Sequence, residues 1–229
     1  MSSVSKIECK SYRDGIGRVI ERFLEEIEKR DVLQYKYLSV SLEELEQDEK
    51  SMLEEVLRFF EEYYFAIGEL AEAYLAVVES MREETKYFLQ MGSYRNTSYR
   101  DVAATVYFNE AYMERYMIGL VLSDYMWINH IYITRWLKEQ FSKTKGKKYL
   151  EIGPGFGNYF LMAVNNDNFE ECIGVDISPK SVEGTRNFVT YFCQDKKEKW
   201  LVECKDFFDF EVGGVKSLIV SSWARCWSM

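Results

Sequence analysis

The chain has 229 residues, which is enough to bury a sizeable core in one or two domains. Its formal net charge of −9 argues against a nucleic-acid partner, because neutralising phosphates requires a basic surface. The five cysteines are odd in number and form no C-x-x-C pair, and no apolar run reaches membrane-spanning length. We therefore expect a cytoplasmic protein without a metal site, a disulfide framework, a nucleic-acid partner or a membrane partner.

Residues 1–145 are expected to form an all-helical domain of about four helices. Apolar residues recur every three or four positions over residues 12–38, which predicts one amphipathic helix. Ser41 and Glu44 have the spacing of a capping box, so a second helix should begin there and continue to about residue 91. Gly68 lies inside this long run and predicts a break or a strong bend.

The second half of this domain should begin after a polar loop at residues 92–98. Helical periodicity resumes over residues 100–141, and the basic segment 142–148 then forms a hinge. Because both prolines of the chain lie after residue 150, proline interrupts none of these helices. We expect the domain to cover a substrate or to mediate homodimer formation.

One face of the 100–141 helix carries hydroxyl groups, an indole and the only histidine of the chain. Its members follow one another at intervals of three or four residues and are Tyr112, Tyr116, Gly119, Ser123, Trp127 and His130. They are either ordinary core packing, in which polar tips find partners, or the wall of a substrate site. In the second case Tyr112, Tyr116 and Trp127 would contact the substrate, and His130 would act as a general base toward a hydroxyl or an amine.

A glycine-rich turn follows the hinge. Residues 149–152 are typical of a buried strand, and Gly153, Gly155 and Gly157 then precede a helix that begins at about Asn158. Glycines at alternate positions permit positive φ angles and a close approach of the backbone to a ligand. A dinucleotide fingerprint has a different spacing, and the acid Glu151 would repel a pyrophosphate. The turn therefore favours a cationic ligand without phosphate.

Two further acids follow the next two predicted strands. The strand at residues 172–176 ends in Asp176, at the place of a ribose-binding carboxylate in a βαβ nucleotide site. Ser178 should cap the next helix, which has Pro179 in its first turn and ends at about residue 192. A third strand at residues 200–203 precedes Asp206. The simpler alternatives are a capping role for Asp176 and a surface position for Asp206.

This order of strand, glycine turn, helix and acid-ended strand resembles the Rossmann-like S-adenosylmethionine (SAM) methyltransferases. The resemblance covers about residues 147–210 and includes Pro154 between the first two glycines. It implies an α/β fold, SAM as cofactor, and methyl transfer to an oxygen or nitrogen atom of a small-molecule acceptor. The cofactor residues that it implies are Glu151, Gly153, Gly155 and Gly157 at the amino-acid part of SAM, Asp176 at the ribose, and Asp206 with Phe207 at the adenine. Ile177 is a further predicted cofactor residue.

The chain departs from the family after Glu211, where a further strand and an acidic segment are expected. Reading residues 213–229 from the third base of the Gly213 codon allows a sequence that ends Gly-Glu-Val-Leu-Glu-His and resembles that segment. We hypothesise that residues 213–229 are a frameshifted tail, so that the cofactor domain, residues 146–229, is an incomplete Rossmann-like parallel sheet of about four strands. Such a truncated form could be inactive. The nucleotide sequence tests the hypothesis, because codons that cannot give the shifted reading would exclude it.

Two alternatives of other classes remain open. An NAD(P)-dependent oxidoreductase would use a similar βαβ unit, although Glu151 and the glycine spacing disfavour it. A non-catalytic dimerisation or scaffold protein would use the helical domain and retain a vestigial cofactor domain. Binding of SAM compared with binding of NAD separates the first alternative from the methyltransferase.

Overall fold

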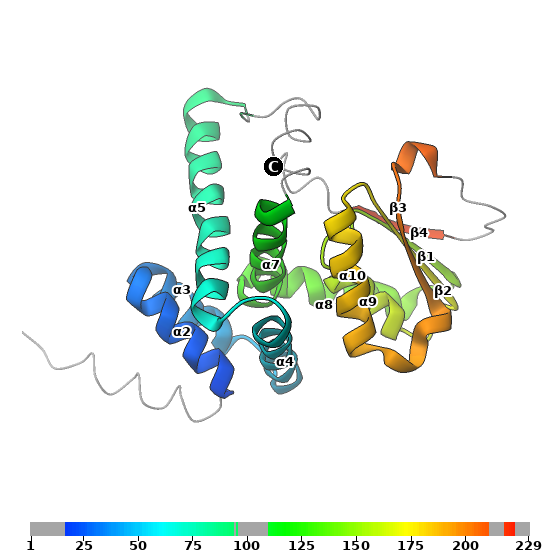
Figure 1. The fold of residues 1–229 in the computed structure, drawn as a ribbon, viewed down its shortest axis with the longest axis horizontal. Helices are drawn as coiled ribbons and strands as arrows, with labels where there is room; N and C mark the ends of the chain where they lie inside the picture. Colours follow the sequence, from blue (N-terminus) through cyan, green and yellow to red (C-terminus); the bar gives the residue numbers. More distant parts are fainter. Residues whose placement is uncertain (1–16, 94, 96–109, 211–217, 223–229) are drawn as a thin grey trace, which may run out of the picture. The chain divides into compact units, whose positions relative to one another are not determined.

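The structure is a computed structural model that describes residues 17–93, 95, 110–210 and 218–222 (Figure 1). Helices fill most of the described part before residue 144, and a parallel sheet with further helices follows, so the fold is α/β. The chain divides into two compact units. The first, here the helical unit, comprises Met1–Val78 with Ile118–Ile131, and the second, here the sheet unit, comprises Glu79–Met117 with Tyr132–Met229.

Six α-helices precede the sheet in the described residues, where about four were predicted. They are α2 (Arg18–Arg30), α3 (Val32–Glu43), α4 (Gln47–Tyr63), α5 (Ile67–Met91), α7 (Glu110–Met126) and α8 (Ile128–Lys143). The break predicted near Gly68 is confirmed, because α4 and α5 are separated at residues 64–66. The predicted start of a helix near Arg100 lies outside the described residues.

Two predictions about the first helices are wrong. The single helix over residues 12–38 is interrupted at Asp31, whose side chain accepts a hydrogen bond from Gln34 N (2.9 Å) and caps the N-terminus of α3. Ser41 caps no helix, since it lies inside α3 and its hydroxyl donates to the Met126 carbonyl. The cap of the next helix uses Glu46 instead, whose backbone N–H donates to the Glu49 carboxylate (2.9 Å).

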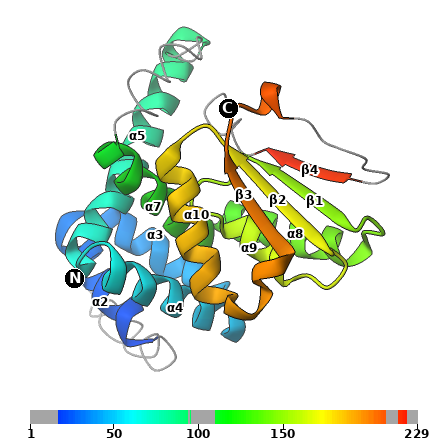
Figure 2. The same ribbon diagram turned by 45° about the vertical axis from the view of Figure 1, so that its right-hand side comes forward.

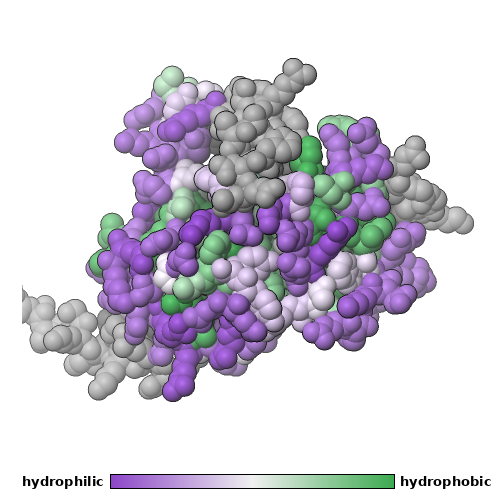
Figure 3. All heavy atoms as spheres, viewed as in Figure 1, coloured by the Kyte–Doolittle hydropathy of each residue, from purple (hydrophilic) through white to green (hydrophobic). Residues whose placement is uncertain are grey.

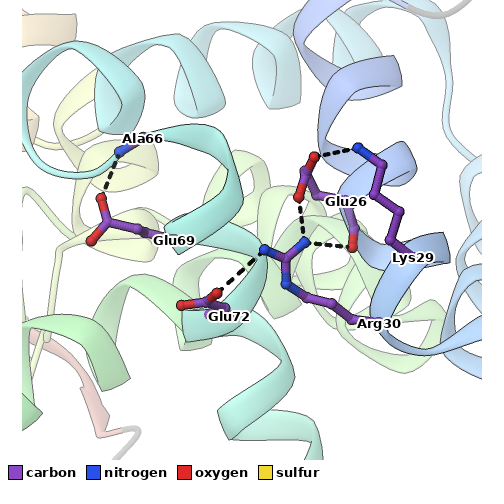
Figure 4. Close-up of polar contacts among 6 residues, drawn as sticks. All are labelled: Glu26, Lys29, Arg30, Ala66, Glu69 and Glu72. Atoms are coloured by element: carbon purple, nitrogen blue, oxygen red, sulfur yellow. Dashed lines mark hydrogen bonds and ion pairs between the residues drawn. The ribbon is translucent and has the colours of Figure 1, made fainter.

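Polar side chains link α2 to α5 in the helical unit. Arg30 joins Glu26 on its own helix to Glu72 on α5, with 3.3 Å between Arg30 Nη2 and Glu72 Oε1 (Figure 4). In the same view the backbone N–H of Ala66 donates to the Glu69 carboxylate at the start of α5 (3.3 Å). The ion pairs are partly exposed and contribute little individually, so the buried apolar face of α2 supplies most of the stabilisation.

The N-terminus of α2 is capped by a residue distant in sequence. The carboxylate of Glu54 on α4 accepts from the backbone N–H groups of Val19 (3.1 Å) and Ile20 (3.0 Å), and Arg58 donates to it (3.0 Å). Glu54 is only 8% exposed. Its charge lies at the positive end of the α2 dipole, where an anion is favourable.

Replacing Glu54 with glutamine is expected to lower the free energy of unfolding by about 1 kcal/mol, because the cap loses its charge while its shape is kept. Urea unfolding measures the change. The matched control is Glu55→Gln, since Glu55 is the next residue on α4 but is exposed. Equal losses in both variants would show that the position of the charge at the α2 terminus is unimportant.

In the part of the chain that the structure describes, four parallel strands form a sheet in the order β3-β2-β1-β4 (Figure 2). Their bounds are β1 (Lys148–Ile152), β2 (Glu171–Asp176), β3 (Trp200–Cys204) and β4 (Leu218–Ser222). The helices α9 (Asn158–Asn165) and α10 (Pro179–Phe192) connect β1 to β2 and β2 to β3, and they pack against each other. The first three strands and both helices confirm the sequence predictions to within one or two residues.

An aromatic cluster within the sheet unit joins the C-terminal part of α8 to β1. The ring of Tyr149 on β1 contacts Phe141 of α8 (5.3 Å between centroids), Phe160 of α9 (6.3 Å) and Phe169 before β2 (5.3 Å). Tyr149 and Phe160 are fully buried. Apolar burial of this kind is the main stabilising contribution to such a layer.

The face of the molecule shown in Figure 3 is largely hydrophilic, as expected for a chain in which 29% of residues are charged. Among the described helices, none combines the length and the apolar composition that crossing a membrane requires.

Candidate functional site

The three glycines of the predicted turn all adopt the left-handed conformation. Gly153, Gly155 and Gly157 have φ angles of 71°, 62° and 89°, which non-glycine residues rarely adopt. The turn is held at its start by Gly153 N donating to Val175 O and at its end by Gly157 N donating to Pro154 O, both at 2.8 Å. The predicted need for positive φ at this junction of β1 and α9 is confirmed.

Gly155 and Gly157 differ in what surrounds them. A Cβ atom on Gly155 would meet no atom within 4 Å, whereas a Cβ atom on Gly157 would lie 2.7 Å from Thr185 Cγ2. Gly157 is therefore required for packing of the turn against α10. Gly155 leaves open space beside its backbone, which allows a ligand to approach closely.

Asp176, at the end of β2, faces the glycine turn. One carboxylate oxygen accepts from Ser178 N (2.9 Å) and the other from Gly155 N (3.4 Å). The side chain is 7% exposed, and burial raises the pKa of this carboxyl to about 6. The N-cap of the following helix α10 is Ser178 and not Asp176. The carboxylate oxygens retain capacity to accept further hydrogen bonds from ligand hydroxyls.

The end of β3 lies beside the end of β2. Lys205 N donates to the Asp176 carbonyl (2.9 Å), and the Cys204 thiol lies 3.7 Å from the Ile177 carbonyl. Asp206 follows directly, and its carboxylate accepts from Phe208 N (3.0 Å), which caps the short 3-10 helix Phe207–Asp209. The turn that carries Asp206 and Phe207 therefore lies at the same sheet edge as Asp176. Contact of Asp206 and Phe207 with an adenine stays a prediction.

Glu151 has a structural partner. Its side chain is fully buried, and the hydroxyl of Tyr149, two residues earlier on the same face of β1, donates to Glu151 Oε2 (2.7 Å). The two residues belong to the α9 side of the sheet, because Glu151 pairs with Gly174, which lies against Phe160. Direct contact of Glu151 with a ligand stays a prediction.

Thr185 is a site residue that the sequence did not reveal. Its hydroxyl lies 2.8 Å from the Gly155 carbonyl and 2.9 Å from the Ser181 carbonyl, so α10 fixes the conformation of the glycine turn. Thr185 is fully buried. The contact joins residues that are 30 positions apart, and no local pattern marks it. The Ser178 cap of α10, by contrast, was predicted and is confirmed.

The first half of α7, which belongs to the sheet unit, packs against the start of α10. Ser181 Oγ lies 3.0 Å from Met117 Sδ, and Lys180 pairs with Glu114 at 3.9 Å. Tyr112 and Tyr116 lie on this part of α7 with their rings stacked 5.8 Å apart. Tyr116 is buried and Tyr112 is exposed. The two tyrosines thus belong to the same unit as the glycine turn, and their contact with a substrate stays a prediction.

The second half of the predicted stripe packs inside the helical unit. A Cβ atom on Gly119 would lie 2.5 Å from the Ala73 carbonyl of α5, so this glycine allows α7 and α5 to approach closely. The Trp127 indole N–H donates to the Tyr74 hydroxyl on α5 (2.8 Å). Gly119 and Trp127 therefore make packing contacts within the helical unit, and contact of Trp127 with a substrate stays a prediction. The single helix predicted to carry it is interrupted at Trp127, between α7 and α8.

Three features of the proposed site lie at the carboxyl ends of β1, β2 and β3. A buried carboxyl group, open space beside Gly155 and the partly exposed ring of Phe207 can accept hydroxyls, admit a ligand and stack on a base, respectively. Within the described ranges, His, Cys, Asp and Glu form no group of three that could hold a metal ion. No family model matches the chain, and neither a curated protein nor a solved structure is significantly similar to it.

Proposed function

We propose that the chain is a SAM-dependent methyltransferase that transfers a methyl group to an oxygen or nitrogen atom of a small molecule. The observation that carries the proposal is the arrangement at the sheet edge. A left-handed glycine turn with open space at Gly155 lies within hydrogen-bond reach of the buried acid Asp176. The turn that carries Asp206 lies on the adjacent strand end.

The strand order supports this proposal. The order β3-β2-β1 corresponds to the first three strands of the Rossmann-like, doubly wound sheets. β4 takes the position of the fourth strand, although it lies within the segment 213–229 of the frameshift hypothesis. In such sheets ligands bind outside the carboxyl ends of the strands, where the order reverses, which here is between β1 and β4. The glycine turn follows β1 directly. The incomplete Rossmann-like domain inferred from the sequence is therefore part of the proposal.

The residues of the chain would act mainly by binding and orientation. SAM would supply an electrophilic methyl group, and the oxygens of Asp176 would accept the ribose hydroxyls. Asp206 and Phe207 would contact the adenine. Holding both reactants in one geometry supplies much of the acceleration in such a transfer, and a base removes the proton of the acceptor where needed.

Thermal unfolding with and without nucleotides tests the proposal. SAM or S-adenosylhomocysteine, each at about 100 times its Kd, should stabilise the chain by about 3 kcal/mol, whereas NAD should not. Gly155→Ala should lose this response, because its Cβ fills the open space. The matched control is Gly92→Ala, since Gly92 has a similar φ of 69° and also has no atom within 4 Å of the added Cβ. Gly92→Ala should retain the full response.

A longer chain with residues 213–229 read in the shifted frame separates truncation from a wrong assignment. Binding by the longer chain alone would support both the methyltransferase and the frameshift hypothesis. A response to NAD but not to SAM would favour the oxidoreductase. If neither chain responded to SAM, the methyltransferase would be excluded and the non-catalytic alternative favoured.

A further inference from the structure

The only histidine of the chain makes its polar contacts through one ring nitrogen. His130, near the start of α8, places Nδ1 3.3 Å from Asp124 Oδ1 and 3.4 Å from Ser123 Oγ. Asp124 and Ser123 both lie on α7, in the same helical unit as His130. Among the described residues, the polar contacts of the imidazole all involve Nδ1.

The hydrogen bond of Ser123 determines which tautomer fits these contacts. The Ser123 hydroxyl donates to the Leu120 carbonyl at 2.7 Å. Because a serine hydroxyl has a single proton, its oxygen can only accept from His130. The ionised carboxylate of Asp124 also only accepts. The proton of neutral His130 therefore lies on Nδ1, and Nε2 carries a lone pair.

The imidazole of His130 packs against Trp127, whose indole is the first member of a chain of hydrogen bonds through Tyr74 to Gln34. The Trp127 ring lies against the imidazole, with 5.0 Å between centroids. The indole N–H of Trp127 donates to the Tyr74 hydroxyl (2.8 Å), which in turn accepts from Gln34 Nε2 (2.6 Å). Tyr74 is fully buried. Such packing restricts rotation of the imidazole and reduces the reorganisation that proton transfer would need.

We infer that Asp124 is a positioning residue that holds His130 in the Nδ1–H tautomer, so that Nε2 is available as a base toward an O–H or N–H group. A base oriented by a third group is the general pattern of activated proton acceptors. The use of Nε2 as a base toward a substrate rests on the proposed function. The tautomer of His130 and the role of Asp124 in setting it do not. The geometry that carries the inference lies entirely within the helical unit.

The step that His130 would carry out is a proton transfer to Nε2. The proton of an O–H or N–H group would pass to Nε2 of His130 and leave that oxygen or nitrogen deprotonated. The resulting imidazolium has an Nδ1–H that faces the Asp124 carboxylate. The imidazolium then returns its proton to water.

Nuclear magnetic resonance of the ring nitrogens tests the inference without any cofactor. A single histidine gives one set of imidazole signals, so no assignment is needed. At alkaline pH the 15N-labelled chain should show mainly the Nδ1–H form. Asp124→Ala should shift the population toward Nε2–H, and Asp124→Asn, which keeps an acceptor oxygen, should retain more of the Nδ1–H form. The exposed Asp195 provides the control variant, Asp195→Ala.

The rate of acylation by diethyl pyrocarbonate measures the reactivity of Nε2 of His130. His130→Gln should abolish the histidine signal, and Asp124→Ala should slow acylation several-fold relative to the intact chain. A dominant Nε2–H tautomer in the intact chain would overturn the inference, as would unchanged spectra and rates in Asp124→Ala. Because both measurements are made without SAM, their failure is distinct from failure of nucleotide binding.

Discussion

Asp176→Asn is expected to stabilise the ligand-free chain by up to about 3 kcal/mol at pH 8. Burial raises the pKa of Asp176 from 3.8 to about 6, so its ionised form is unfavourable in the folded state, and the difference corresponds to roughly 3 kcal/mol. Asparagine cannot ionise and removes this term. Denaturant unfolding measures the change.

The expected gain depends on pH. Between about pH 3.8 and 6 the folded chain binds more protons at this site than the unfolded chain, so the contribution of Asp176 to stability falls as pH rises. The destabilisation is absent below pH 3.8 and complete above pH 6. The gain from Asp176→Asn should therefore vanish near pH 4. The control is Asp167→Asn, because Asp167 is exposed. Equal gains at pH 4 and pH 8 would contradict this explanation.

The same substitution should weaken nucleoside binding. Ribose hydroxyls that donate to Asp176 favour its ionised form, so binding should improve as pH rises and level off above about pH 6. In the intact chain the affinity for adenosine should be about tenfold lower at pH 5 than at pH 7. Asp176→Asn should bind about 100-fold less tightly at pH 7, given roughly 1.5–3 kcal/mol for each charged hydrogen bond. Calorimetric titration with adenosine measures both effects, and a pH-independent affinity would exclude the ribose contact.

Gly157→Ala is the second substitution with a large expected effect, a loss of about 3 kcal/mol in the free energy of unfolding. The left-handed backbone at φ 89° costs a non-glycine residue about 1–2 kcal/mol. The new Cβ would also lie 2.7 Å from Thr185 Cγ2, and overpacking of this kind costs about 1–3 kcal/mol. Urea unfolding measures the loss.

A double-mutant cycle separates the two costs. Thr185→Ser removes the methyl group and retains the hydroxyl that contacts the Gly155 carbonyl. In this background Gly157→Ala should lose only the backbone term, so the cycle should show a coupling of about 1 kcal/mol or more. Gly92→Ala, at φ 69° with no atom near its added Cβ, reports the backbone term alone. A coupling near zero would mean that contact with Thr185 does not determine the need for glycine.

Local pattern in the sequence was sufficient for the elements around the glycine turn. The alternate spacing of Gly153, Gly155 and Gly157 predicted positive φ angles, and a serine before Pro179 predicted the cap of α10. These features depend on residues within about four positions of one another, so a linear pattern contains them. The acid at the end of β2 was likewise predicted, and the structure places it within reach of Gly155 N.

Contacts between distant residues were decided only by the tertiary structure. Periodicity alone cannot distinguish one helix over residues 12–38 from two helices, and Asp31 ends the first because its side chain caps the second. The cap of α2 by Glu54, the contact of Thr185 with Gly155 and the packing of Gly119 on α5 each join segments at least 30 positions apart. Burial also decided the chemistry of Asp176, because the cost of removing a carboxylate from water depends on the surrounding atoms. The sequence by itself determined which groups lie at the sheet edge, and the fold determined which of them are buried, paired or open to a ligand.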